Sequence, residues 1–352
     1  MADWSAPMQQ TFEYYTVDPG TWKDVKLLNN VTSSSISRDR DAETLGSATI
    51  DMNEAVGESY VRIYLVTIQN GVRERHCLGT FLVQTPSSKF DGMVSKASVD
   101  AYTPLIELKE NQPPLGYYLE KDANIMQWAA RLTKEHARAP VVDAESSEKL
   151  FRDFVANTDD TWMTFLIDLL ANADFYFDLD EMGRILFAPK QDTASLQPVW
   201  TYTDDNSSIL YPEISLDHDI YGVPNVVEII YSDSNDQYYA RVVNDDENSP
   251  ISTVNRGREI VYREENPKFP GEPTQAMITE YAEKTLKNLS TLEYTVSYSH
   301  GYNGVRLGDC VRLDYKRANM KDIKARVVSQ SIKCEQGCPV SETAVFTKKL
   351  WR

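Results

Sequence analysis

The sequence between residues 157 and 189 constrains the fold most, because an amphipathic helix there runs directly into a tight β-hairpin. The helical part begins with a capping region at residues 159–161 and has its apolar side chains on one face: Trp162, Phe165, Leu166, Leu169 and Leu170. The hairpin part spans residues 175–189 and turns at Asp180-Glu181-Met182-Gly183, where glycine suits a tight turn. β-Rich sequence lies on both sides of this join, so an α+β fold is expected.

The first hundred residues predict antiparallel strands joined by tight turns. A run at residues 60–68 is rich in β-branched and aromatic side chains, and Asn70-Gly71 after it is a strong hairpin signal. The return strand covers residues 72–84 and contains Gly79, a predicted bulge. Alternating side chains predict two further strands, one with Ala48, Ile50 and Met52, and one over residues 93–102 that opens after Asp91-Gly92.

Residues 104–200 predict a helical region that ends in the hairpin. Prolines at positions 104, 113 and 114 mark the exit from the first β region. One helix is expected around residues 125–132 with Asp122 as its cap, and a second, preceded by Ser146 and Ser147, from the apolar set Leu150, Phe151, Phe154 and Val155. We interpret these apolar faces as core-facing, and a cofactor or partner groove is the minority interpretation.

The sequence returns to strands after Pro189. Strands are expected over residues 226–231, 238–243, 294–298, 309–315, 324–332 and 343–351, and a helix over residues 276–289 after Pro273. The order is therefore β, α, β, one helix, and β. Both ends of the chain could supply a barrel of similar size, which suggests a duplicated module.

Charge is distributed unevenly along the 352 residues. The whole chain has a formal net charge of −17, but residues 301–352 carry 11 basic and 5 acidic side chains. An acidic body would repel the phosphates of nucleic acid, so stable nucleic-acid binding is not expected. The basic segment could pair with an acidic neighbouring subunit or could simply protect a solvated strand edge with lysines. No apolar run is long enough for a membrane span, and the first residues lack a secretory signal pattern, which favours folding in a cytoplasm.

The sequence offers no catalytic, cofactor-binding or metal-binding site. It contains no phosphate-binding loop, dinucleotide fingerprint, nucleophile elbow or zinc-protease motif, and its four histidines are far apart. Cys334 and Cys338 lie in turn-like sequence, and we favour two reduced thiols across a hairpin. A disulfide or a metal clip is the alternative, and a clip would need further ligands such as Cys310 or His300.

Acidic and aromatic side chains leave one rival interpretation open. Carboxylates cluster at Asp204-Asp205, Asp217 with Asp219, and Asp245-Asp246-Glu247, and 20 tyrosines include three adjacent pairs. Paired carboxylates could hydrolyse a sugar that tyrosines bind. Solvated loops, strands and subunit interfaces account for the same residues with fewer assumptions.

Several segments together resemble the baseplate hub and tail-tip proteins of tailed bacteriophages. The polar stretch at residues 35–50 leads into a strand, as in the family's opening. The helix and hairpin are similar to the family's helix, strand, Asp-x-x-Gly turn and strand, with Asp180, Gly183 and the final Pro189. Residues 225–229 resemble the strand that enters the family's second barrel, and the helix at 276–289 precedes Gly308-Asp309-Cys310-Val311, which resembles its Gly-Asp-x-Val strand start. The order and spacing of these segments carry the resemblance over nearly the whole chain.

The resemblance implies a mainly β, α+β fold. It has two antiparallel β-barrels like those of tail tubes, with an inserted helical domain. The expected divisions are residues 1–103 for the first barrel, 104–200 for the helical α+β domain, 201–243 with 294–352 for the second barrel, and 244–293 for a loop-rich insertion with one helix.

The resemblance also implies a structural, non-enzymatic function in the virion. Three subunits would form a pseudo-sixfold ring in the tail baseplate that joins the tail tube to the central spike, with a channel through which DNA passes without specific binding. The implied partners are the other copies of a homotrimer, the tail tube protein, the spike or tail-tip protein, the tape measure protein and other baseplate proteins. No cofactor, metal or membrane insertion is implied, assembly is expected in the host cytoplasm, and contractile and non-contractile tails both fit. A carbohydrate-active or sugar-binding tail protein is the alternative.

Overall fold

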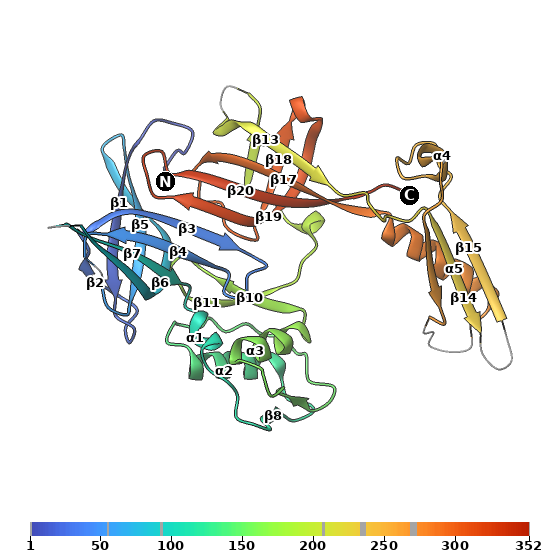
Figure 1. The fold of residues 1–352 in the computed structure, drawn as a ribbon, viewed down its shortest axis with the longest axis horizontal. Coiled ribbons are helices and arrows are strands. Elements are labelled where there is room, and N and C mark those ends of the chain that lie inside the picture. The colour runs from blue at the N-terminus through green and yellow to red at the C-terminus, as the bar shows by residue number, and fades with distance from the viewer. Residues whose placement is uncertain are drawn as a thin grey trace. The chain divides into compact units, whose positions relative to one another are not determined.

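A computed structural model describes residues 2–54, 56–91, 94–205, 208–232, 237–267 and 273–351, without the side chains of residues 85–95. The chain divides into two compact units (Figure 1). The first consists of Met1–Ile214 with Tyr298–Ala344, and the second of Ser215–Ser297 with Val345–Arg352. The predicted turn at Gly92 and the start of its strand at Met93 lie outside the described residues.

One large sheet dominates the described residues. Its strands are β1 (Gln9–Val17), β2 (Asp24–Leu27), β3 (Val31–Asp39), β4 (Gly46–Met52), β5 (Ser59–Gln69), β6 (Val72–Asp91), β7 (Val94–Tyr102), β12 (Trp200–Thr203), β13 (Leu210–His218), β17 (Thr291–Gly301), β18 (Cys310–Tyr315), β19 (Met320–Lys333) and β20 (Pro339–Lys349). Their order is β13-β17-β20-β19-β3-β4-β7-β6-β5-β1-β2, with β18 also beside β19 and β12 beside β18. The expected mainly β, α+β class is confirmed.

The pairing of β19 with β3 joins the two ends of the chain. These strands run antiparallel with Ile332 opposite Ile36, and both side chains are fully buried. The strands of the first hundred residues and those after residue 298 therefore form one continuous sheet. Within the described strands, no pairing closes either half into the separate barrel that the sequence led us to expect.

Local patterns in the first strands are confirmed by the structure. Ala48, Ile50 and Met52 alternate into the core and are at most 2% exposed, because successive strand residues point to opposite faces. The hairpin of β5 and β6 turns at Asn70 and Gly71, both with positive φ. The predicted bulge is also present, since Ile63 pairs with Gly79 while the next residue, Tyr64, pairs with Cys77.

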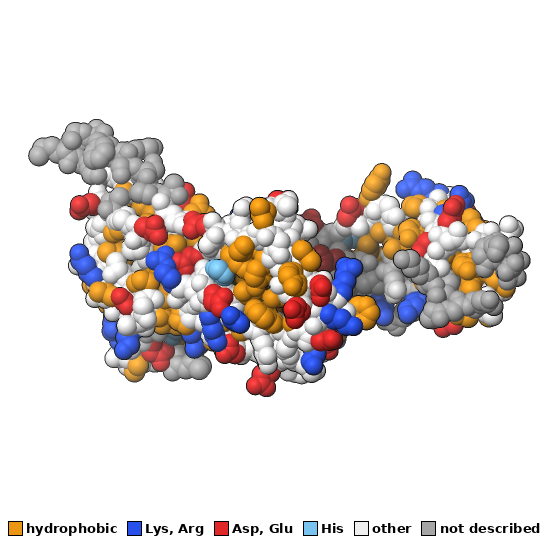
Figure 2. All heavy atoms as spheres, turned by 90° about the horizontal axis from the view of Figure 1, so that it is seen from below, with side chains coloured by type: hydrophobic (Ala, Val, Ile, Leu, Met, Phe, Trp, Pro, Cys, Tyr) orange, Lys and Arg blue, Asp and Glu red, His pale blue; other side chains and the backbone are white. Residues whose placement is uncertain are grey.

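The helical region follows the first strands. Its elements are α1 (Ile106–Lys109), β8 (Tyr118–Leu119), α2 (Ile125–His136), β9 (Phe154–Val155), α3 (Trp162–Ala171), β10 (Phe175–Leu179), β11 (Ile185–Pro189) and the 3-10 turn η1 (Thr193–Ser195). The apolar faces of α2 and α3 pack into one core that also includes Tyr60 and Leu82 of the sheet, so these faces are core-facing as predicted. Figure 2 shows this region from below, where hydrophobic side chains gather on its surface.

The predicted helix over residues 150–155 is wrong. Residues 151–152 form a bend and Phe154–Val155 form β9, which pairs antiparallel with β8 so that Val155 lies opposite Tyr118. The spacing of the four apolar residues fits both a helix and a strand. Hydrogen bonds to the chain before α2 decide against the helix, because Leu150 N donates to Ala123 O at 3.0 Å. The predicted cap is also wrong by two residues, because Asn124 caps α2 and Asp122 has a φ of 66°.

The second unit contains a separate small sheet. Its elements are β14 (Val226–Ser232), β15 (Gln237–Val243), α4 (Thr253–Arg256), β16 (Val261–Glu265) and α5 (Gln275–Leu289), and the first unit adds the 3-10 turn η2 (Lys316–Ala318). Ile278, Ala282 and Leu286 of α5 cover Val227 and Ile229 of β14. The strands at 226–243 were expected in the second barrel, but among the described strands β14 pairs with β15 and β16 in a separate sheet, which α5 covers. None of the described helices has the length and apolar character needed to cross a membrane.

Candidate functional site

The tip of the β10–β11 hairpin makes many polar contacts within the first unit. Asp180 closes the turn, because its backbone oxygen accepts from Gly183 N at 2.9 Å and its carboxylate accepts from Arg184 N at 2.8 Å. Gly183 has a φ of 76°. A Cβ atom on Gly183 would lie 2.7 Å from the Cβ of Thr80 on β6. The predicted Asp-x-x-Gly turn is therefore confirmed, and its glycine is needed for both conformation and space.

Side chains of the first strands bind the backbone of this tip. The carbonyl of Met182 accepts from Trp22 Nε1 at 2.7 Å and from Arg62 Nη2 at 3.1 Å. The carbonyl of Glu181 accepts from the Cys77 thiol at 2.9 Å. Arg62 is 1% exposed and forms an ion pair with Asp24 at 2.7 Å. A buried, fully paired arginine thus holds the hairpin against the sheet.

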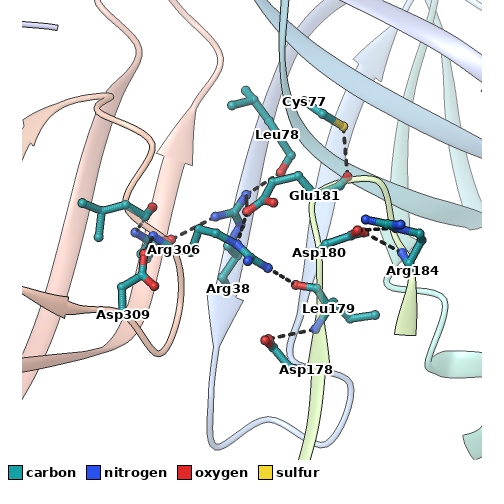
Figure 3. A network of polar contacts seen from close by, with 12 residues as sticks. Arg38, Cys77, Leu78, Asp178, Leu179, Asp180, Glu181, Arg184, Arg306 and Asp309 are labelled. Atoms are coloured by element: carbon teal, nitrogen blue, oxygen red, sulfur yellow. Dashed lines mark hydrogen bonds and ion pairs between the residues drawn. The ribbon is translucent and has the colours of Figure 1, made fainter. Parts of the chain in front are cut away.

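The loop before β18 binds the other side of the tip (Figure 3). Arg306 Nε donates to the Glu181 carboxylate at 2.6 Å, and Arg306 Nη2 donates to Leu179 O at 2.7 Å. Asp309 accepts from Arg306 N at 2.8 Å. Arg38 of β3 lies 4.0 Å from the Glu181 carboxylate and donates to Leu78 O at 2.6 Å. Glu181 therefore stands between arginines from the first and last parts of the chain.

Burial changes the acidity of the groups around this tip. It raises the pKa of Asp178 and the pKa of Asp309 above their ordinary value, although the Arg306 guanidinium opposes both shifts. Burial lowers the pKa of Arg306, but Glu181 and Asp178 beside it outweigh burial and the pKa is raised overall. The cluster is thus a mixed-charge group in which Arg306 stays protonated.

Asp178→Asn is expected to stabilise the protein at neutral pH. Because the pKa of Asp178 is raised in the folded state, its stabilising contribution is complete below the unfolded pKa and is lost as pH rises through the folded pKa. The asparagine variant lacks this loss, so its advantage should shrink as pH falls toward the ordinary aspartate range. Urea unfolding at several pH values measures the effect, with Asp217→Asn on an exposed strand as the control. An advantage that is independent of pH would contradict the assignment.

A second polar network continues inward from Arg38. Arg38 Nη1 donates to Gln330 Oε1 at 3.1 Å, and Gln330 Nε2 donates to Glu342 Oε2 at 2.8 Å. The Glu342 carboxylate accepts from Tyr298 and lies 3.4 Å from His300 Nε2, which is 3.0 Å from the Tyr202 hydroxyl. Burial, with Glu342 adding to it, raises the pKa of Tyr298 and the pKa of Tyr202 well above the ordinary value. Both phenols are therefore neutral: Tyr298 donates to Glu342, and Tyr202 accepts from Asn303 Nδ2 at 2.9 Å.

The burial of this network indicates a structural function. Its members after Arg38 are at most 7% exposed: Tyr202, Tyr298, His300, Asn303, Gln330 and Glu342. They come from β12, β17, β19, β20 and the loop after β17. Satisfied buried polar groups fix the mutual register of the strands that carry them. His300 is thus a hydrogen-bonded residue of this buried network.

Several solved structures resemble this fold over nearly the whole chain. No protein-family model matches the chain, and no curated protein matches it. The 43 kDa tail protein of prophage MuSo2 from Shewanella oneidensis matches with a TM-score of 0.63 at 12% identity, covering 96% of this chain and 98% of that protein. The tail protein from Neisseria meningitidis MC58 matches with a TM-score of 0.62 at 11% identity, covering 97% and 98%.

The chain has the fold of bacteriophage tail proteins. A third match is the c3393 protein of E. coli, a component of the type VI secretion system that exhibits structural similarity to the T4 bacteriophage tail proteins gp27 and gp5. It has a TM-score of 0.50 at 8% identity and covers 92% of this chain and 75% of that protein. The tail-protein fold therefore includes both units and the helical region.

The cysteines that the sequence singled out lie inside this tail-protein fold. All four are free thiols. Cys334 and Cys338 share one apolar core with Tyr14, and Cys338 N closes their turn by donating to Glu335 O at 2.9 Å. Cys310 is buried on β18, and His300 bonds to the polar network instead. In the described part of the chain, no three His, Cys, Asp or Glu side chains are grouped to hold a metal.

All four thiols are expected to react with a water-soluble thiol reagent only after unfolding. Burial raises the pKa of Cys77 to about 12 and the pKa of Cys334 to about 11, and it also raises the pKa of Cys338 and the pKa of Cys310. Little thiolate is therefore present at neutral pH, and the thiolate is the reactive form. Labelling kinetics in buffer and in urea, with mass spectrometry of each peptide, measure this. A rapidly labelled Cys334 or Cys338 in buffer would contradict the buried placement.

Asp204, Asp219 and Asp246 lie in loops, and Asp217 lies on the exposed strand β13. Asp246 accepts from Asn248 N at 2.8 Å, and Asp219 accepts from Tyr221 N at 2.7 Å, which are turn-forming contacts. Asp204 accepts from Arg317 N at 3.3 Å. The tip residues Glu181 and Arg306 were not singled out from the sequence. The only available signal was the turn itself, because its partners are distant in sequence.

Proposed function

We propose that this protein is a structural baseplate hub or tail-tip protein of a bacteriophage tail. The observation that carries the proposal is the likeness to two phage tail proteins over almost the full length of this chain and of theirs. The hairpin tip supports it, because this partly buried site ties the helical region to β5 and to the loop before β18. Such a site suits a protein that transmits load between neighbours.

In this proposal three subunits form a pseudo-sixfold ring. Each subunit contributes two curved, tail-tube-like barrels that close only with the strands of its neighbours. The large sheet ends at β2 and β13, and these ends carry exposed apolar side chains such as Val25, 67% exposed, and Tyr211, 42% exposed. Unpaired sheet ends need cover. A closed ring supplies it.

The proposed ring joins the tail tube to the central spike and surrounds a channel for DNA. The tape measure protein and other baseplate proteins are the further proposed neighbours, and the virion tail is the proposed location. A net charge of −17 supports free passage of DNA, because phosphates are repelled rather than bound. We propose no enzymatic activity for this chain, since its buried His300 and Glu342 are occupied in holding strands together.

Cryo-electron microscopy of assembled particles that contain this protein tests the proposal. We expect three copies around the tail axis between the tube and the spike, with the strands next to the channel contributed by more than one copy. A single copy, or a position away from the axis, would rule out the hub. Density for a saccharide between two facing carboxylates would favour the rival sugar-binding or carbohydrate-active tail protein instead.

A further inference from the structure

An exposed apolar patch lies at the β8–β9 end of the helical region. It consists of Leu115, Tyr118, Phe151 and Val155, which are 85%, 51%, 91% and 58% exposed. Figure 2 shows hydrophobic side chains gathered on this side of the region, with charged side chains at the margin. Large apolar side chains grouped in this way on a protein surface mark interaction sites. We call these four residues the β8–β9 patch.

A bend at residues 151–152 and the short strand β9 after it create the patch. Leu150 and Phe154 point inward: Leu150 is 4% exposed, and Phe154 packs on Phe165 of α3 with ring centroids 4.9 Å apart. Val155 points outward, because side chains alternate along a strand, and Phe151 is exposed in the bend that precedes this strand. A two-stranded ladder covered on one side would ordinarily carry polar residues on the other. In the β8–β9 ladder, Leu119 and Phe154 face the core, whereas Tyr118 and Val155 are exposed although they are apolar.

The charged residues near the β8–β9 patch indicate which kind of partner it would bind. Residues 115–122 and 145–160 carry seven acidic side chains (Glu120, Asp122, Glu145, Glu148, Asp153, Asp159 and Asp160) and three basic ones (Lys121, Lys149 and Arg152). These two segments, which carry the patch, therefore have a net charge of −4, and we call their charged side chains its margin. Complementary margins favour association, and like charges oppose it.

A second copy of this chain fits the patch poorly. A symmetric contact would bring two margins of the same negative charge together. The basic part of the chain, residues 301–352, would meet the charge requirement, but among its described residues no large hydrophobic side chain is exposed. It therefore offers no apolar group to fill the centre. The occupant must combine both properties and is a different protein.

We propose that the β8–β9 patch is a docking site for a partner protein that inserts apolar anchor side chains flanked by lysine or arginine. The anchors cover Phe151 and Val155, and the basic flanks meet the acidic margin. Burying exposed aromatic and aliphatic side chains supplies the affinity. The margin increases the rate of association and its salt dependence. The site is independent of the trimer proposed above, because it lies on the helical region and not on the ends of the large sheet.

Selection from a random peptide library displayed on yeast, against the full-length protein, tests this proposal. We expect enriched peptides that combine apolar residues with flanking lysine or arginine. The selected peptides should bind the double variant Phe151→Ser/Val155→Ser at least about tenfold more weakly, since hot-spot anchors contribute most of the affinity of an interface. Both residues are exposed, so the variant should melt at the wild-type temperature. The matched control is Val25→Ser/Val72→Ser, in which two exposed valines of the large sheet are changed and binding should not change.

A second double variant tests the contribution of the acidic residues near the patch. Glu120→Gln/Glu148→Gln should weaken the same peptides at low salt and leave binding at high salt unchanged, because salt screens exposed charges. The proposal is overturned if the selected peptides bind the Phe151→Ser/Val155→Ser variant as tightly as wild type, or if they are acidic. A wild-type dimer that this variant abolishes in sedimentation would also overturn it and assign the patch to self-association. None of these outcomes decides whether the large sheet forms a trimeric ring.

Discussion

Arg62→Ala is expected to lower the free energy of unfolding of the first unit by about 3 to 5 kcal/mol, the range for breaking a buried ion pair from one side. Arg62 is 1% exposed and donates to Asp24, to Thr80 and to the carbonyl of Met182. Its loss leaves a cavity, removes the charge partner of Asp24, and leaves the Met182 carbonyl with Trp22 as its one remaining side-chain donor. Urea unfolding followed by circular dichroism measures the change.

The control for this prediction is an arginine with a similar ion pair at the surface. Arg131 is paired with Glu135 one helical turn away, and its side chain is 62% exposed. Arg131→Ala should therefore cost only about 0.3 to 0.5 kcal/mol, as exposed helix pairs do. If Arg62→Ala costs no more than Arg131→Ala, the hairpin tip is not held by Arg62.

Gly183→Ala is expected to destabilise the first unit by about 3 kcal/mol. A left-handed conformation costs a non-glycine residue about 1 to 2 kcal/mol. The new methyl group would also lie 2.7 Å from the Cβ of Thr80, and overpacking costs about 1 to 3 kcal/mol. The hairpin tip can relieve the contact only by moving away from β6. That movement would lengthen its hydrogen bonds to Trp22 and Arg62.

Gly71 provides a matched control for the space requirement. It also has a positive φ, 78°, but a Cβ atom there would meet nothing within 4 Å. Gly71→Ala should therefore cost only the backbone part, about 1 to 2 kcal/mol. Thermal unfolding of both variants separates the two contributions. Equal losses at positions 71 and 183 would show that the tip is not packed against Thr80.

The Arg62→Ala and Gly183→Ala substitutions both weaken the contacts that hold the hairpin tip. It is held by Arg62 from the first strands and by Arg306 from the last ones. Weakening either contact should loosen the helical region together with the sheet. In a tail assembly, this region would carry force between the proposed ring and whatever protein occupies the β8–β9 patch.

Predictions from the spacing of apolar residues were correct where that spacing fits either a helix or a strand, but not both. Helix α3 and the hairpin after it were predicted because the apolar spacing changes from helical to alternating at one point, with Gly183 in the turn. Residues 150–155 failed because their four apolar side chains fit both periods. There the structure was decided by contacts with residues 118–123, which the local sequence does not contain.

The candidate site was only partly predictable, for the same reason. The sequence showed the Asp180 and Gly183 turn, but it could not show that Arg62 and Arg306 meet there, since these residues are 244 positions apart. The network of His300 and Glu342 is also formed by strands that pair across the sheet. Pairing between distant strands depends on the whole fold, not on any local period.

The sequence by itself determined the mainly β class, the helix followed by a hairpin, the turn glycines and the acidic character of the chain. Each of these depends on residues a few positions apart, where backbone geometry directly limits the choice. Only the tertiary structure decided that β3 pairs with β19, that 226–243 form a sheet of their own, and that Phe151 faces solvent. These outcomes depend on which distant surfaces bury each other, because burial is gained only when both surfaces are brought together.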